Sequence, residues 1–526
     1  MEQFKKLPVD LSSFSTMINE NYLYVDKTKI IYEIISRGRC FFLARPRRFG
    51  KSLLVSTLKE IFLGNKDLFK DLWIGKNASY AWDSYPIIHI DFLRVDSSCP
   101  EKLEKSLSEK LLEIGLNYDI EISRASSLLD RLDLLVHQLS EKHGKVVILI
   151  DEYDYPIIKN MHDTSIAVKN KEILRSFYGC IKGLGDHTRF LFLTGVSKFS
   201  KTSIFSGVNN LDDISLDPYV AALMGYTEEE MHAYFPPYIE IIANKRGCSQ
   251  QTILDEMRTW YNGYRFSKDN VKVFNPFSVL YYLHKQERAN YWFESGTPTF
   301  LLDLIKKSPH TLENIDHIVA SASTLQTFEI ETLPLVTLLY QTGYLTIEEY
   351  YSEEAMYKLT YPNEEVRRSI NSYLIGILLG SEKSGVETAV FQMRRALQEK
   401  NIAAFCDTLK VLFANIPYSM HIQKEAYYHS LFQLIGTLLG FDIQSEVLTS
   451  VGRIDLLLQT SKHIYIFEFK FGKTVEEDMA QIKDRRYYEK FLNYGKEIFL
   501  IGMVFDFKDK KFAMEWTSKP FNAGNL

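Results

Sequence analysis

The stretch that most constrains the fold is Cys40–Leu54, where a short apolar run leads into a turn and then into a periodic helix. Backbone N–H groups of such a turn, together with the positive end of the following helix, bind nucleotide phosphates. Lys51 would reach the β- and γ-phosphates, and Ser52 would bind Mg²⁺. The stretch therefore predicts a phosphate-binding loop that holds ATP with Arg48, Phe49, Gly50, Lys51, Ser52 and Leu53.

The loop departs from the usual pattern G-x-x-x-x-G-K-[ST] at one position, because Arg45 stands in place of the first glycine. Pro46, with its fixed φ, can set the bend that this glycine would have eased. A lone Gly-Lys-Ser is common by chance, and its ordinary alternative is a strand-to-helix turn with a basic tip. The prediction therefore needs a second motif.

That motif is Lys145–Asp154, an apolar run that ends on two carboxylates. It is typical of a buried parallel strand that delivers acidic side chains to its C-terminal edge. Asp151 would hold the Mg²⁺ shell, and Glu152 would orient or deprotonate the attacking water. Alone, the carboxylates could cap the next loop. The two motifs in this order, about a hundred residues apart, predict a P-loop nucleotide site.

Strands and helices alternate around these motifs, which predicts a parallel α/β sheet. Tyr85–Leu93 is a further expected strand, the run from Glu101 to Ile114 an expected helix, and Arg189–Ser200 the next strand. In this last position P-loop ATPases keep a polar sensor of the γ-phosphate. The candidates are Thr194, Ser197 and Lys198, and the alternative is that they are turn residues bonded to local backbone.

Length and composition limit the class of protein. A chain of 526 residues suggests about three folding units. The formal net charge of −5 gives no global basic field for nucleic acid, so any such surface must be local. Five scattered cysteines indicate a reducing compartment. Neither a signal peptide nor an 18-residue apolar run occurs, so we expect a cytoplasmic protein that does not contact the membrane.

From about residue 226 the pattern becomes helical, with a capped helix start at Thr227–Glu230. Leu338–Ile347 is similar to a helix that turns into the first strand of a winged-helix hairpin, a wing that could touch DNA or pack on the nucleotide domain. We expect four segments: an ATPase domain at 1–225, a helical lid and winged-helix region at 226–370, a helical connector at 371–420 and a second α/β domain at 421–526.

This last segment carries a second group of chemical residues. Val451–Gln459 and His463–Phe471 are expected to be two strands joined by a polar turn. Side chains repeat every two residues along a strand, so Glu468 and Lys470 share a face, with Asp455 on the neighbouring strand. Asp455 and Glu468 would bind Mg²⁺ or Mn²⁺, and Lys470 would position the water or stabilise negative charge. This arrangement predicts metal-assisted phosphodiester hydrolysis.

Supporting residues are expected around this group. Glu425 or Glu446 could supply a further carboxylate ligand, and Gln481 could contact the lysine or the substrate. Lys483–Arg486 could follow a phosphate backbone or form a solvated helical face. The alternative for the whole site is a half-exposed hairpin in which Glu468 and Lys470 are cross-strand partners without a metal.

Five motifs spread over nearly the whole chain resemble the bacterial AAA-ATPase-like proteins that carry a C-terminal PD-(D/E)XK nuclease domain. They are Arg45–Ser52, Asp151–Asp154, Tyr261–Tyr264, Tyr340–Leu345 and Gly452–Asp455 with Glu468–Lys470. The resemblance implies a STAND-like or AAA+ ATPase module, a winged helix and a restriction-endonuclease-like α/β domain. Arg45 is part of the resemblance, whereas Ile454 replaces the proline of the family name.

Two functions follow as hypotheses. In the first, the nucleotide state or homo-oligomerisation of the N-terminal module controls a C-terminal hydrolase of DNA or RNA. In the second, the protein is a nucleotide-dependent switch whose nuclease-like domain only binds nucleic acid or protein. The intact set of Asp455, Glu468 and Lys470 favours the hydrolase.

Overall fold

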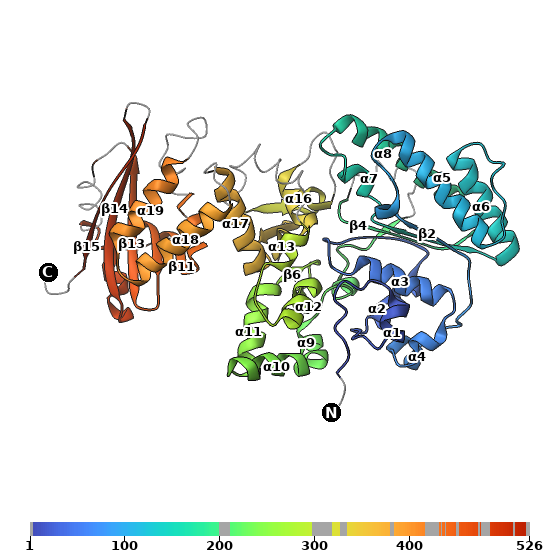
Figure 1. Cartoon of the computed structure of the whole chain (residues 1–526), viewed down its shortest axis with the longest axis horizontal. Coiled ribbons are helices and arrows are strands. Elements are labelled where there is room, and N and C mark those ends of the chain that lie inside the picture. Colours follow the sequence, from blue (N-terminus) through green and yellow to red (C-terminus); the bar gives the residue numbers. More distant parts are fainter. Residues whose placement is uncertain are drawn as a thin grey trace. The chain divides into compact units, whose positions relative to one another are not determined.

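The computed structural model describes residues 4–198, 211–296, 318–326, 334–378, 383–415, 431–448 without 433 and 437, 452–471, 474, 484–508 and 511–521. Within this part of the chain, two compact units divide between Val366 and Arg367 (Figure 1). No helix among the described residues combines the length and apolar character needed to cross a bilayer.

The first unit is built on a five-stranded sheet with the order β2-β3-β4-β1-β5, in which every neighbouring pair is parallel. Its strands are β1 Cys40–Ala44, β2 Ile87–Asp91, β3 Val146–Asp151, β4 Thr188–Gly195 and β5 Asp212–Asp213. All six residues of β3 are buried, as its continuous apolar run predicts. Because β1 and β3 both run parallel to β4, the phosphate loop after β1 and the acidic end of β3 lie at the same edge of the sheet.

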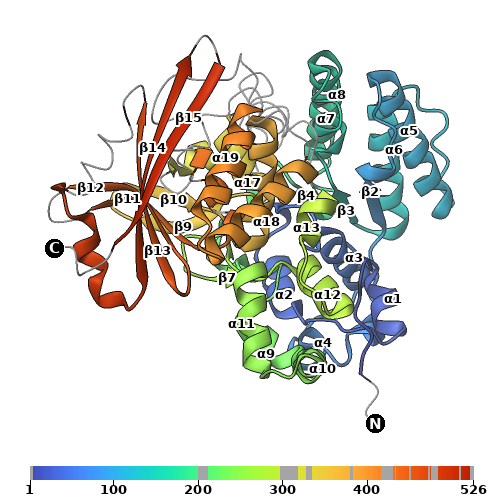
Figure 2. The same ribbon diagram turned by 60° about the vertical axis from the view of Figure 1, so that its left-hand side comes forward.

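Helices cover both faces of this sheet, which confirms the predicted α/β class (Figure 1). On one face lie α1 Phe14–Asn19, α2 Thr28–Arg37, α3 Lys51–Phe62 and α4 Trp73–Asn77. On the other lie α5 Pro100–Asn117, α6 Leu128–His143, α7 Tyr155–Ile158 and α8 Thr164–Gly183. Figure 2 shows the same separation after rotation. Both α3 and α6 contact β3, the strand between β2 and β4, from opposite faces of the sheet (Figure 1).

The rest of the first unit is mainly helical. It contains α9 Glu228–Tyr234, α10 Pro236–Arg246, α11 Gln250–Tyr261, α12 Pro276–Lys285 and α13 Tyr291–Gly296. The predicted capped start is confirmed, since Thr227 and Glu230 form a reciprocal capping box at α9. An apolar core joins these helices to Leu23 and Val25 from the N-terminal segment. The N-terminal segment and α9 to α12 therefore fold together.

Short strands complete this unit. β6 Tyr264–Arg265 pairs with β7 Lys272–Val273, and a three-stranded antiparallel sheet has the order β8-β10-β9. Its elements are β8 Val319–Ser321, α15 Ala322–Gln326, α16 Leu335–Thr342, β9 Thr346–Tyr351 and β10 Met356–Thr360. The predicted helix-to-hairpin turn is present, since α16 ends at Gly343 and β9 follows. Assignment of this hairpin as a winged helix stays a prediction.

The second unit combines helices with a mixed five-stranded sheet in the order β11-β12-β13-β14-β15. Its strands are β11 Asp442–Leu448, β12 Arg453–Gln459, β13 His463–Phe471, β14 Glu497–Lys508 and β15 Lys511–Pro520, with β13 and β14 parallel and the other pairs antiparallel. The predicted hairpin of two strands joined by a polar turn is β12–β13.

The segment expected to be a helical connector forms α17 Glu364–Leu378, α18 Lys383–Gln398 and α19 Ile402–Ala414. Residues of α18 and α19 share one apolar core with the C-terminal sheet. Phe405 of α19, for example, packs with its ring centroid 6.0 Å from that of Phe467 on β13. These two helices are thus part of the second unit's core.

Candidate functional sites

The predicted phosphate loop joins β1 to α3 at the carboxyl edge of the sheet. Gly50 caps α3 with φ +91°, and a Cβ there would meet no atom within 4 Å. Such a left-handed backbone favours glycine, which explains the residue before Lys51. Arg48 also has a positive φ, +66°. The loop therefore presents its backbone in the conformations that an anion-binding turn requires.

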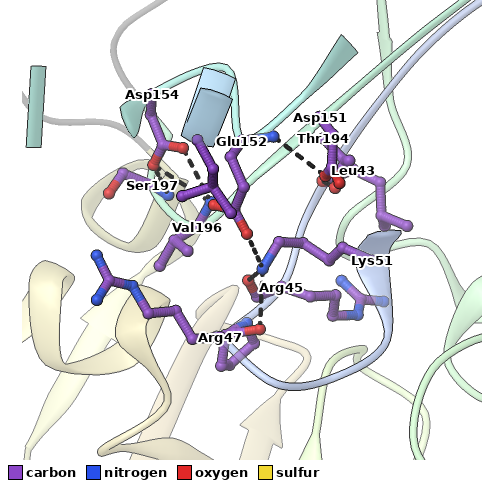
Figure 3. A network of polar contacts seen from close by, with 12 residues as sticks. Leu43, Arg45, Arg47, Lys51, Asp151, Glu152, Asp154, Thr194, Val196 and Ser197 are labelled. Atoms are coloured by element: carbon purple, nitrogen blue, oxygen red, sulfur yellow. Dashed lines mark hydrogen bonds and ion pairs between the residues drawn. The ribbon is translucent and has the colours of Figure 1, made fainter. Parts of the chain in front are cut away.

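Lys51 lies at the centre of a polar network (Figure 3). Its side chain is only 3% exposed, and its Nζ lies 3.2 Å from Oε1 of Glu152. The same ammonium donates to the carbonyl oxygens of Arg45 and Pro46, each at 3.2 Å. These contacts hold a cation beside the phosphate loop and within reach of the carboxylate predicted to act on water.

The two acidic residues at the end of β3 differ in their surroundings. Asp151 is buried, and its Oδ1 accepts from the backbone N–H of Glu152 at 3.1 Å. Burial, and next the charge of Glu152, raise the pKa of Asp151 to about 6, against a hydrogen bond with Ser52 and the charge of Lys51. Glu152 has φ +51°, a strained backbone of the kind that clusters at functional sites.

Arg45, which replaces the usual glycine, is a buried structural cation. Its Nη1 donates to the carbonyls of Ala44 and Ser215 at 2.9 and 2.7 Å, and its guanidinium lies 4.3 Å from the ring centre of Phe266. Burial lowers the pKa of Arg45 to about 10. The side chain thus bonds to the backbone around the loop and leaves the phosphate side to Lys51.

The three expected sensor residues are all buried and engaged with nearby groups. The hydroxyl of Thr194 donates to the carbonyl of Leu43 at 2.9 Å, and Lys198 Nζ lies 3.0 Å from Oδ2 of Asp213. The backbone N–H of Ser197 donates to Asp154 at 2.6 Å, while its hydroxyl has no hydrogen-bond partner among the described residues. The sensor role stays a prediction, and Ser197 is its best-placed candidate.

A cavity of about 520 Å³ adjoins the phosphate loop. Its lining contains the predicted ATP-binding residues Arg48, Phe49, Gly50, Lys51, Ser52 and Leu53. The lining also has an apolar part, formed by Leu11, Val25, Leu223, Met224, Phe277 and Leu280. This pairing of a phosphate loop with an apolar chamber fits a nucleotide. The apolar chamber could not be predicted from the sequence, because its walls come from segments far apart along the chain.

A second, polar cavity of about 520 Å³ lies beside Ser52 and Asp151 and also contains Asp91. Asp91 ends β2 and is paired in register with Asp151 on β3. A hydroxyl and a carboxylate are oxygen donors of the type that Mg²⁺ prefers, so Ser52 and Asp151 fit the expected metal. Asp91 is a further carboxylate at this edge. Its sequence signal is its place at the end of a predicted strand.

In the second unit, the three predicted hydrolase residues lie together on β12 and β13. Lys470 Nζ is 3.3 Å from Oε1 of Glu468 and 3.9 Å from Oδ2 of Asp455. Oδ2 of Asp455 also accepts from the backbone N–H of Phe469 at 2.8 Å, which ties the two strands together. The arrangement places two carboxylates and an ammonium around one point.

The electrostatics of this group are set by burial. Glu468 is fully buried, and burial followed by the charge of Asp455 raises the pKa of Glu468 to about 7. Lys470 and Arg485 oppose this rise. Arg485 is exposed and donates to the hydroxyl of Tyr487 at 3.2 Å. Lys483 lies outside the described residues, and among the described members of the expected basic run the charge of Arg485 acts on Glu468.

The supporting residues are only partly within the described structure. Glu425 and Gln481 lie outside the described residues, and for Glu446 only the backbone, in β11, is described. Among the described residues, no three His, Cys, Asp or Glu side chains cluster as a metal site. The described carboxylate pair of Asp455 and Glu468 nevertheless has the oxygen chemistry that suits Mg²⁺ or Mn²⁺.

Comparisons with known proteins match a different family model to each of the two units. A family model described as "Predicted AAA-ATPase" matches residues 8–205, and one described as "PD-(D/E)XK nuclease superfamily" matches residues 423–516. A protein of Azotobacter chroococcum mcd 1, described as "Uncharacterized protein in vnfD 5'region", is 36% identical over 517 residues, which are 95% of this chain and 96% of that protein. No solved structure matches the chain. The chain therefore belongs to the AAA-ATPase-like family whose members carry a C-terminal PD-(D/E)XK nuclease superfamily domain.

Proposed function

We propose that this protein binds and hydrolyses ATP in its first unit, and that the nucleotide state controls a metal-dependent nuclease in its second unit. The observation that carries the nuclease half is that the carboxylates of Asp455 and Glu468 both lie within 3.9 Å of the Lys470 ammonium. The ATPase half is supported by Lys51 and Glu152, which face one another across the phosphate loop.

In the ATPase half, each residue has a distinct role. Lys51 neutralises the β- and γ-phosphates. Its ammonium must then either leave Glu152 or contact both Glu152 and the nucleotide. Once released, the Glu152 carboxylate can accept a proton from the attacking water. Ser52 and Asp151 would hold Mg²⁺, which when bound neutralises phosphate charge. Burial of this network strengthens each electrostatic contact.

In the nuclease half, Asp455 and Glu468 would hold Mg²⁺ or Mn²⁺, which when bound polarises the scissile phosphate and acidifies water. Lys470 supplies a fixed positive charge beside the reacting phosphate and can orient the nucleophilic water. The raised pKa of Glu468 means that this carboxyl must lose its proton before it can bind a cation.

The test is a cleavage assay on the full-length protein with single- and double-stranded DNA and RNA. We expect cleavage that needs Mg²⁺ or Mn²⁺ and that disappears in Asp455→Ala, Glu468→Ala and Lys470→Ala, with melting temperatures near the wild-type value in the absence of metal. Lys51→Ala should lower cleavage if the ATPase controls the nuclease. No cleavage under any metal and nucleotide condition would leave the switch hypothesis. Cleavage that survives in Asp455→Ala would place the active site elsewhere.

A further inference from the structure

We infer that Glu365 is a positioning residue of the nucleotide site, holding the phosphate loop through Trp292 and a wall of the nucleotide cavity through Ser278. The inference rests on the nucleotide binding proposed above. Glu365 is fully buried in the first turn of α17, and each of its carboxylate oxygens accepts one hydrogen bond from a different element of the unit.

The first branch runs to the phosphate loop. Oε1 of Glu365 accepts from the backbone N–H of Trp292 at 2.7 Å. The indole Nε1–H of Trp292 donates in turn to the carbonyl of Arg47 at 2.9 Å. Arg47 lines the nucleotide cavity beside Lys51. One buried carboxylate thus fixes the donor that holds a carbonyl of the phosphate loop.

The second branch runs to the apolar chamber. Oε2 of Glu365 accepts from the hydroxyl of Ser278 at 2.7 Å. Ser278 is fully buried in the first turn of α12, between Phe277 and Leu280, which line the chamber. Hydrogen bonds to an ionised acceptor are among the stronger ones in proteins. The position of α12 against the chamber is therefore tied to the carboxylate that also serves the phosphate loop.

Two family motifs that the proposed chemistry does not use surround this pathway. Tyr264, from Tyr261–Tyr264, lies 4.8 Å from Phe49 of the phosphate loop between ring centres. Tyr344, from Tyr340–Leu345, lies 5.1 Å from Trp292 between ring centres. These rings restrict the orientations open to Trp292 and the loop. The motifs thus act as the rigid surroundings of the Glu365 pathway.

The experiment measures dissociation constants of the full-length protein for ATP and for tripolyphosphate, which lacks the nucleoside. Trp292→Phe keeps an aromatic ring but removes the indole donor. It should weaken the binding of both ligands about threefold to tenfold, which corresponds to the loss of one neutral hydrogen bond. Ser278→Ala acts on the chamber, so it should weaken the binding of ATP and leave the binding of tripolyphosphate unchanged. Glu365→Ala should weaken both ligands more than about tenfold.

Glu364→Ala, a change of the neighbouring carboxylate in the same helical turn, is the matched control and should bind both ligands as wild type does. A general loss of stability would weaken both ligands in every variant, so the selective effect of Ser278→Ala distinguishes positioning from folding. Wild-type dissociation constants in both Trp292→Phe and Ser278→Ala would overturn this inference alone. A wild-type protein that binds neither ligand would overturn the proposed function as well.

Discussion

At the level of single residues, the ammonium of Lys51 has three oxygen partners among the residues that the structure describes, and of these three only Glu152 is charged. A triphosphate offers more negative charge than one carboxylate, so it can draw this ammonium away from Glu152. In the proposed mechanism the ion pair then has a chemical meaning, because binding of the nucleotide would release the carboxylate that is proposed to act on water.

We expect Lys51→Ala to abolish detectable ATP binding with the fold intact, because it removes the cation that meets the β- and γ-phosphates. Glu152→Gln should still bind ATP but hydrolyse it at least about a hundredfold more slowly, since a positioned general base contributes roughly a hundredfold to ten-thousandfold. Calorimetric titration and phosphate release measure the two effects. Wild-type affinity in Lys51→Ala would contradict the phosphate-loop assignment, and unchanged turnover in Glu152→Gln would assign the base elsewhere.

Binding of Mn²⁺ to the second unit should depend on pH through Glu468. Its pKa of about 7 means that the carboxyl is protonated below pH 7, where a cation must displace the proton. Affinity should therefore fall as the pH falls, by up to about tenfold per unit below pH 7, and level off above it. Calorimetry at pH 6 and pH 8 checks this, with Glu468→Gln as the control that binds weakly at both. Equal wild-type affinity at the two pH values would contradict it.

The sequence can propose candidate residues where the chemistry lies in one local motif, and the roles of these residues stay predictions. Lys51, Asp151, Glu468 and Lys470 could be named because strand periodicity and the Gly-Lys-Ser turn bring neighbours in sequence together in space. The apolar chamber and Glu365 could not, because hydrogen bonds such as that between Ser278 and Glu365 join residues that are distant along the chain. Nothing in local composition marks such a pair.

At the level of elements, the turn after α16 lies directly against the phosphate loop. Gly343 has φ +90°, and a Cβ built there would lie 2.7 Å from Cβ of Pro46. Gly247, at the end of α10, also has a positive φ of +64°, but a Cβ there would meet nothing within 4 Å. The two glycines share a backbone requirement and differ in the contact.

We therefore expect Gly247→Ala to lower the free energy of unfolding by about 1 kcal/mol, the cost of an alanine in the left-handed conformation, and to leave the affinity for ATP unchanged. Gly343→Ala should cost more and should also weaken ATP binding, since the methyl group must displace Pro46. Denaturant unfolding and ATP titration of both variants measure this. Equal losses of stability, with ATP affinity unchanged in both, would show that the contact with Pro46 has no role.

The elements themselves were largely predictable, since β3 and the β12–β13 hairpin lie where their patterns put them. The packing of the helices after residue 370 was less predictable. Their helical spacing predicts α18 and α19, but periodicity identifies only which face of a helix is buried and not the element against which that face packs. Tertiary packing, such as that of Phe405 on Phe467, shows that these helices belong with the C-terminal sheet.

At the level of the whole molecule, this packing predicts where the chain can be cut. A fragment of residues 367–526 keeps α18 and α19 with the sheet and should fold alone. A fragment of residues 421–526 loses Phe405, Leu409 and Phe413, which are buried in the shared core, and should not fold. Circular dichroism and thermal unfolding of both fragments check this. Cooperative unfolding of the shorter fragment would show that the helices are dispensable.

The boundary between the two units has a consequence for how genes of this family can recombine. It falls inside α17, a continuous helix whose first turn carries Glu365. A recombination event at this position would cut that helix in two. An event near residue 423, where the match to the nuclease family begins, would transfer the C-terminal sheet with its carboxylates but without α18 and α19, which form part of the same core. Neither breakpoint yields two intact products, so the two chemistries should pass through evolution as one gene. The relative from Azotobacter chroococcum is matched over 96% of its length and 95% of this chain, so the match extends over both units.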